Sequence, residues 1–144
     1  MPQSPITGNA TPSQKQLNES QTCFHPNCFA GKPLQEGGLG VDFRFQSDGT
    51  LRGLFSCDDR FEGYPGVIHG GIVSTALDAA MTNCLFSHGI RAMTAELKIR
   101  FHESVVSGQS AVIEARLETS RGPLHRLRAE LRQRGDLRVT ATAK

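Results

Sequence analysis

The sequence lacks the patterns that identify several common classes of protein. No apolar run reaches about 18 residues, which argues against a transmembrane helix. No P-loop, GxSxG or HExxH motif occurs, which argues against nucleotide hydrolysis, serine-hydrolase catalysis and zinc proteolysis. Gly38 and Gly40 lack the third glycine and the following helix of a dinucleotide-binding fingerprint. The function therefore has to be inferred from residues outside these common motifs.

A strong charge imbalance is also missing, because 16 basic residues face 14 acidic ones, for a net charge of +2. We therefore expect neither nucleic acid nor a membrane surface as a partner. Twelve of the basic residues are arginines, and four of these, at positions 126, 128, 132 and 134, share one predicted strand. We interpret them as a solvated face with Glu114, Glu118 and Glu130 as cross-strand partners. The alternative is a grip for a phosphate-bearing ligand, since arginine suits phosphate geometry.

The first 22 residues are polar, carry three prolines in their first twelve positions and lack the apolar core of a signal peptide. We expect a flexible tail over residues 1–22, one domain over residues 23–144, and a cytoplasmic location. The four cysteines are then expected to be free thiols.

A short cysteine-containing segment follows the predicted tail. Cys23, His25 and Cys28 supply three candidate metal ligands within six residues, and Cys57 or His102 offers a fourth. Structural zinc sites usually draw on paired CxxC or HxxxH spacings, which are absent here. The sequence therefore predicts no metal site, and no other cofactor.

Hydrophobic periodicity indicates an α+β domain. Apolar residues recur at helical spacing over residues 71–87 and alternate with polar ones elsewhere. The predicted strands cover residues 39–46, 51–57, 94–101, 110–118, 125–134 and 137–143. The simplest packing lays the one long helix across the apolar face of a six-stranded antiparallel sheet. Open sheet edges and a small core favour oligomerisation.

The start of the predicted helix carries the motif His69-Gly70-Gly71. A helix N-terminus presents unpaired N–H groups and the positive end of the helix dipole. Glycine at this point lets a ligand oxygen approach the backbone closely. We interpret the Gly70 N–H, with Gly71 as a second donor, as an oxyanion site; the simpler alternative is a tight loop entering a helix.

A single carboxylate interrupts the apolar helix. Ser74, Asp78 and Thr82 lie at i, i+4 and i+8, so they form one narrow polar stripe. Burial of an unpaired, ionised carboxylate costs on the order of several kcal/mol of stability. A catalytic role is one reason for a protein to tolerate that cost. We interpret Asp78 as a base or nucleophile, with Thr82 orienting the carboxylate or the attacking water. The alternative is a solvated aspartate on the exposed side of the helix.

These features resemble a known family. The segment EGYPGVIHGGIVSTALDAAM, the following RAMTAELKIRF and the predicted order of strands and helix look like a hotdog-fold acyl-CoA thioesterase. The resemblance covers about residues 37–144 and is clearest to the phenylacetic-acid-pathway (PaaI-like) group of the 4-hydroxybenzoyl-CoA thioesterase superfamily. It implies a homodimer or a dimer-of-dimers tetramer with active sites at subunit interfaces.

The resemblance also implies roles for single residues. The Gly70 N–H would polarise the thioester carbonyl, and Asp78 of the neighbouring subunit would activate water or attack directly. His69 and Thr82 match catalytic positions, and the expected substrate-binding residues are Gly71, Ser74 and Thr94.

Two departures from the family pattern matter. Ala79 stands where many relatives carry a second acid, and His102-Glu103 stands where a proline often ends the strand. Two other functions stay open: a hotdog enoyl-CoA hydratase or dehydratase that uses His69 with a carboxylate, and a non-catalytic acyl-CoA binding module.

Overall fold

The structure, a computed structural model, describes residues 11–144. It contains two α-helices, six strands and two short 3-10 turns, at Leu34–Glu36 and Asp59–Phe61. In chain order the main elements are α1 (Gln14–Phe24), β1 (Asp42–Phe45), β2 (Leu51–Phe55), α2 (Gly70–Ser87), β3 (Leu97–Phe101), β4 (Ala111–Arg121), β5 (Leu124–Gln133) and β6 (Asp136–Ala143).

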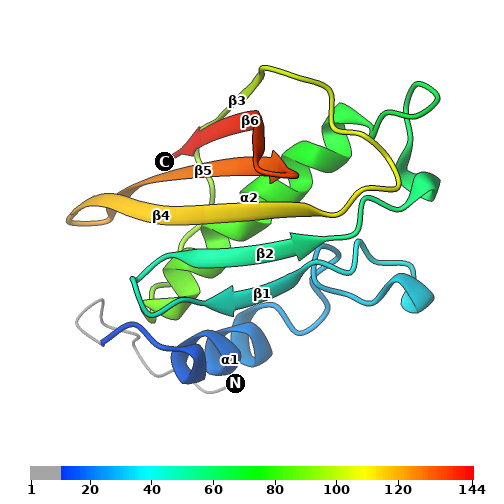
Figure 1. Cartoon of the computed structure of the whole chain (residues 1–144). Helices are drawn as coiled ribbons and strands as arrows, with labels where there is room; N and C mark the ends of the chain where they lie inside the picture. Colours follow the sequence, from blue (N-terminus) through cyan, green and yellow to red (C-terminus); the bar gives the residue numbers. More distant parts are fainter. Residues whose placement is uncertain (1–10) are drawn as a thin grey trace.

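The strands form one antiparallel sheet in the order β1-β2-β4-β5-β6-β3. Figure 1 shows α2 lying across one face of this sheet and α1 beside the β1 edge, while no helix of residues 11–144 covers the opposite face. This arrangement confirms the predicted α+β hotdog architecture, with one long helix on a six-stranded antiparallel sheet.

The core lies between α2 and the sheet, where the alternating strands place their apolar residues. Leu51, Ile113 and Leu131 are fully buried from three different strands. On α2, Ala76 and Ala80 are also fully buried, and their small side chains let the helix approach the sheet closely. The predicted alternation is therefore confirmed across the centre of the sheet.

The N-terminal segment differs from the prediction. Residues 14–22, expected within a flexible tail, belong to α1, and residues 1–10 lie outside the described residues. Ser13 caps the helix through the Gln16 N–H, and Leu17 is fully buried. The Ser20 hydroxyl donates to the Phe86 carbonyl on α2 at 3.1 Å. One buried leucine and these polar anchors stabilise the helix, although its composition is that of a tail.

The edge strand β3 is shorter and more exposed than predicted. It begins at Leu97 and not at residue 94, and its apolar side chains are incompletely covered. Leu97 is 37% exposed and Phe101 is 49% exposed. Its only strand partner in the described part of the chain is β6, so β3 presents a free edge.

Candidate active site

The first turn of α2 is organised by a histidine cap. His69 is the N-cap residue, and its Nδ1 accepts a hydrogen bond from the Gly71 N–H at 2.9 Å. An accepting Nδ1 carries no proton, so the ring N–H of neutral His69 is at Nε2. The Gly71 N–H is therefore occupied, whereas no hydrogen bond within residues 11–144 uses the Gly70 N–H. Of the two expected donors, Gly70 is the free one.

Gly70 and Gly71 differ in the space that surrounds them. A Cβ at Gly71 would stand 3.1 Å from both Cε1 and Nδ1 of His69, so a larger residue there would push against the capping imidazole. A Cβ at Gly70 would meet only the Phe101 ring, at 3.5 Å, which is an ordinary contact. The protein's own packing therefore does not require a glycine at position 70.

Gly70 lines an open groove of about 750 Å³. Val73 and Phe101 give this groove apolar walls, while His69 and Glu103 contribute polar groups. The exposed Tyr64 also lines it. The groove combines a free N–H at the positive end of a helix dipole with apolar walls, which suits a ligand that joins a polarisable carbonyl to an apolar chain.

The loop before α2 is held against the segment that follows β3. Val67 and Val106 form a β-bridge, and the Ile68 N–H donates to the Val105 carbonyl at 2.8 Å. The Glu62 carboxylate accepts from the Ser107 hydroxyl across the same contact, at 2.6 Å. These bonds fix the direction in which the chain enters α2, and with it the direction of the Gly70 N–H.

Asp78 is partly exposed on α2, and its carboxylate has one hydrogen-bond partner among the described side chains. The Thr94 hydroxyl donates to Asp78 Oδ1 at 2.7 Å, which leaves Oδ2 without a side-chain donor among the described residues. Thr94 was expected to bind substrate, and the structure places it as the group that orients Asp78. Thr82 was expected in that orienting role; it lines a cavity of about 100 Å³ together with Thr94. The Ser74 hydroxyl donates to the Gly70 carbonyl at 2.8 Å within the helix.

The two halves of the predicted site do not meet within one chain. Asp78 lies eight positions after Gly70 on a continuous helix, a distance of about 12 Å at the usual rise. The structure joins His69 to Gly71, and Asp78 to Thr94, but it leaves the two groups apart.

Gln133, which is not among the predicted site residues, holds the segment after β3 that contacts the loop before α2. Gln133 is fully buried at the end of β5, where its Nε2 donates to the carbonyls of Val106 and Gln109 at 2.8 and 3.0 Å. Its Oε1 accepts from the Val106 N–H at 2.9 Å. Sequence alternation indicated its buried side but not these partners, which lie more than 20 positions away in the chain.

The described part of the chain offers no group of three His, Cys, Asp or Glu side chains that could hold a metal ion. His25 packs edge-on against Phe86, with ring centroids 4.9 Å apart. Cys57 and Cys84 are buried, and burial raises the pKa of the Cys57 thiol to about 11 and that of the Cys84 thiol to about 12. Within residues 11–144, neither helix has the length and apolar character needed to cross a bilayer.

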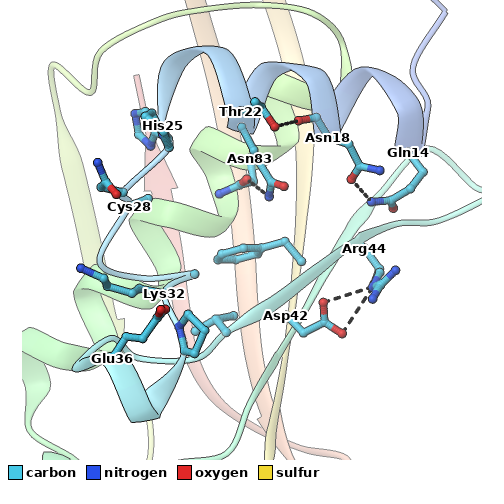
Figure 2. Close-up of a pocket in the computed structure, with 17 residues that line it drawn as sticks. Gln14, Asn18, Thr22, His25, Cys28, Lys32, Glu36, Asp42, Arg44 and Asn83 are labelled. Atoms are coloured by element: carbon cyan, nitrogen blue, oxygen red, sulfur yellow. Dashed lines mark hydrogen bonds and ion pairs between the residues drawn. The ribbon is translucent and has the colours of Figure 1, made fainter.

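A second pocket, of about 600 Å³, lies at the opposite edge of the sheet, between α1, the loop after it and β1. Figure 2 shows its mixed polar lining, with Lys32 and Glu36 across from the Asp42–Arg44 ion pair. Asn83 of α2 reaches this pocket and is held by the Gln21 side chain at 2.7 Å. None of the predicted site residues lines it.

Comparison with known proteins agrees with this fold. A model of the thioesterase superfamily matches residues 65–140. Rat acyl-coenzyme A thioesterase THEM4 is 30% identical over 90 residues, which cover 60% of this chain and 39% of that protein. The chain thus spans about two fifths of the length of the curated relatives it matches.

Solved structures show the same fold. A phenylacetic acid degradation-related protein from Ralstonia eutropha JMP134 is 28% identical, with a TM-score of 0.68 over 79% of this chain and 89% of that one. Escherichia coli PaaI has a TM-score of 0.75 over 90% of this chain and 91% of its own, at 14% identity, where the likeness concerns the fold alone. With a family model that matches more than half of the sequence, the chain belongs to the thioesterase superfamily.

Proposed function

We propose that the protein hydrolyses acyl-CoA thioesters to a free acid and coenzyme A. The observation that carries this proposal is the free Gly70 N–H, which lines an apolar groove at the start of α2. The Asp78 carboxylate on the same helix, oriented by Thr94 from the loop that follows, supplies the base. Membership of the thioesterase superfamily, and the name of the rat relative as an acyl-coenzyme A thioesterase, support this substrate class.

The active site is completed by a second copy of the chain. Asp78 and Gly70 are too far apart on one helix to act on the same carbonyl, and β3 runs beside both, with Phe101 near Gly70 and Thr94 just before its other end. Antiparallel pairing of two β3 edges about a two-fold axis places the Phe101 end of one strand beside the Thr94 end of the other. Gly70 of one subunit then faces Asp78 of the other in a homodimer.

In this site the reaction proceeds by addition and elimination. Asp78 Oδ2 takes a proton from water as the water oxygen attacks the thioester carbon, and the Gly70 N–H stabilises the oxyanion that forms. A donor of this kind contributes about 3–4 kcal/mol to the transition state. The tetrahedral intermediate then expels the sulfur, which leaves as a thiol with the proton that Asp78 accepted from water. Cleavage of the C–S bond yields the acid.

Asp78→Asn tests the base directly. Thiol release from a panel of short, long and aromatic acyl-CoAs should fall about 10²- to 10⁴-fold. The circular dichroism spectrum and the oligomer mass should not change, since Asp78 lies outside the buried core. Thr94→Val removes the 2.7 Å bond and should lower kcat about tenfold or more, whereas Thr94→Ser keeps the hydroxyl and should stay near wild type. Unchanged thiol release in Asp78→Asn contradicts the proposal.

The same panel separates the alternative functions. Hydration of an enoyl-CoA without thiol release identifies a hydratase, and calorimetric binding of acyl-CoA without turnover identifies a binding module. A single turnover in ¹⁸O-labelled water distinguishes base from nucleophile. Direct attack by Asp78 forms a mixed anhydride, and its hydrolysis at the Asp78 carbonyl places ¹⁸O in the Asp78 carboxylate, whereas attack by water on the thioester places ¹⁸O only in the product acid.

Subunit mixing tests whether the site is shared between chains. Asp78→Asn and Gly70→Val should each be inactive, the second because a branched side chain fills the groove beside the N–H. Co-expression of the two should restore about a quarter of wild-type activity, since half of the dimers are mixed and each mixed dimer has one intact site. No recovery in mixed dimers contradicts the shared site.

A further inference from the structure

We propose that Tyr64 is a specificity-determining residue, whose ring forms a fixed wall of the groove at Gly70 and favours thioesters with an apolar, uncharged acyl group. This inference rests on the proposed thioester hydrolysis and adds the class of acyl group to it. Tyr64 and Gly70 line the same groove, and 82% of the tyrosine surface is exposed. An acyl chain bound at Gly70 can therefore cover a large aromatic surface that the protein itself leaves in water.

Exposure of one aromatic ring is ordinary on a protein surface, and the loop that carries Tyr64 is what sets it apart. Pro65 and Gly66 are the central residues of a β-turn, which the Val67 N–H closes by donating to the Tyr64 carbonyl at 3.0 Å. Gly66 has a φ of +79°, the sign that a type II turn requires at this position. The Gly63 N–H donates in turn to the Val67 carbonyl at 2.9 Å. The backbone of Tyr64 is therefore fixed by the turn itself.

A carboxylate ties this turn to the rest of the domain. Glu62 Oε2 accepts hydrogen bonds from the Gly66 N–H and from the Ser107 hydroxyl, each at 2.6 Å. These bonds hold the turn against the segment after β3, which also fixes the start of α2. The backbone of Tyr64 therefore keeps its position relative to the Gly70 N–H. A wall that is already ordered adds binding free energy without the entropic cost of ordering a loop.

The charge of the groove indicates which half of the thioester lies against Tyr64. Among the described residues that line the groove, Glu103 is the one carboxylate, and there is no lysine or arginine. Glu103 also takes part in none of the ion pairs within residues 11–144. The phosphates of coenzyme A are repelled by such a carboxylate, and so is an acyl group that ends in a carboxylate of its own. Val73 and Phe101 add apolar walls, so the groove suits an uncharged acyl chain.

A second copy of the chain is the competing occupant beside Tyr64, since Phe101 of the free β3 edge lines the same groove. If a partner subunit covers the ring, its removal weakens the assembly and affects every substrate equally. If the acyl group covers the ring, its removal leaves the assembly intact and has an effect that grows with acyl length. The position of Tyr64 among the residues that line the groove favours the acyl group.

Tyr64→Ala, assayed on acyl-CoAs of increasing length, tests the proposal. For hexanoyl-CoA, kcat/KM should fall about tenfold or more, mostly through a higher KM, an effect that about two buried methylene groups account for. For acetyl-CoA, kcat/KM should change by less than about threefold, because an acetyl group offers little apolar area to the ring. Tyr64→Phe keeps the ring and should stay within about twofold of wild type for both substrates.

The matched control is Phe29→Ala, which removes an exposed aromatic ring outside the groove and should leave the ratio of hexanoyl-CoA to acetyl-CoA turnover unchanged. Glu103→Gln should raise kcat/KM for succinyl-CoA about threefold or more relative to 4-methylpentanoyl-CoA, its uncharged counterpart of similar shape. An unchanged succinyl-CoA ratio overturns the role of charge. An unchanged hexanoyl-CoA ratio in Tyr64→Ala, an equal fall for all acyl-CoAs, or a change in oligomer mass overturns the proposal for Tyr64.

Tyrosine fluorescence gives a readout that does not depend on turnover. The chain contains one tyrosine and no tryptophan, so tyrosine emission reports on Tyr64 alone. Saturation with the non-hydrolysable ketone S-(2-oxoheptyl)-CoA should change this emission, whereas S-(2-oxopropyl)-CoA at the same nucleotide absorbance should leave it nearly unchanged. Equal responses overturn the proposal for Tyr64 and leave the proposed hydrolysis untouched. A wild-type protein that releases no thiol from any acyl-CoA contradicts the hydrolysis, and the fluorescence then still decides whether Tyr64 contacts the acyl chain.

Discussion

Replacement of Gln133 by methionine should be among the most damaging single substitutions outside the groove. Methionine has a similar length and fills the same buried space, but it can make none of the three short hydrogen bonds to the segment after β3. The Val106 N–H and the carbonyls of Val106 and Gln109 then lose their side-chain partner. An orphaned buried polar group costs about 1–3 kcal/mol.

The expected loss follows from how far each group can reach water. Val106 and Gln109 are only partly buried, so their carbonyls recover part of their hydration. We therefore take the lower end of the range for each group, which gives a loss of about 3 kcal/mol in the free energy of unfolding. That is a large fraction of the roughly 5–15 kcal/mol that stabilises a domain.

Urea unfolding followed by circular dichroism measures this loss, since the chain contains no tryptophan. Gln46→Met is the matched control: its Nε2 donates to the Arg44 carbonyl in an exposed hairpin, and its loss should cost no more than about 0.5 kcal/mol. Hydrogen exchange should also show that the amides of Ile68 and Ser107 lose protection, because they donate to the Val105 and Gly66 carbonyls across the contact with the segment that Gln133 holds. A Gln133→Met loss below about 1 kcal/mol refutes the reasoning.

Two further predictions follow from the described contacts. Gly70→Ala should keep the fold and its stability while thiol release falls about tenfold or more, whereas Gly71→Ala should lose about 0.5–2 kcal/mol as its Cβ displaces the capping imidazole; equal stability of the two variants contradicts this account. Burial raises the pKa of Cys57 from 9.0 to about 11 and that of Cys84 to about 12, so at pH 8 a thiol reagent should modify the other two cysteines first and these two only as the fold opens. The folded protein therefore holds these two thiol protons more tightly than the unfolded chain does, and this contribution to stability is complete below pH 9 and is lost as the pH rises through about 11. The free energy of unfolding should fall over this interval. A profile that does not change with pH there contradicts the burial argument.

The strands and the long helix could be predicted from the sequence because burial on one face leaves a regular pattern. The alternation that includes Leu131 on one strand and Ala141 on the next marks residues that the structure buries. α1 leaves no comparable signal, since its polar sequence is stabilised by one buried leucine, a serine cap and contacts with α2. Such tertiary anchors join positions more than 60 residues apart, and local composition does not carry them.

The candidate site was predictable to the same extent. The spacing of His69, Gly70 and Asp78 along α2 is local, and the structure places these residues on the helix as expected. The partner of Asp78 is not local: Thr82 lies one turn away on the same helix, yet Thr94 beyond the helix end makes the hydrogen bond. Sequence spacing favours partners on the same helix face, whereas the path of the loop after α2 determines which hydroxyl lies within hydrogen-bond distance of Asp78.

The geometry of α2 also limits which mechanisms are available. Gly70 and Asp78 belong to one uninterrupted helix of 18 residues, so no rotation of side chains and no ordinary helix bend brings them to the same carbonyl. Either one of them takes no part in the reaction, or the two act from different chains. The free β3 edge lies beside both and offers the surface on which a second chain can pair. Activity in mixed Asp78→Asn and Gly70→Val dimers therefore decides whether this protein has two half-sites or one isolated carboxylate.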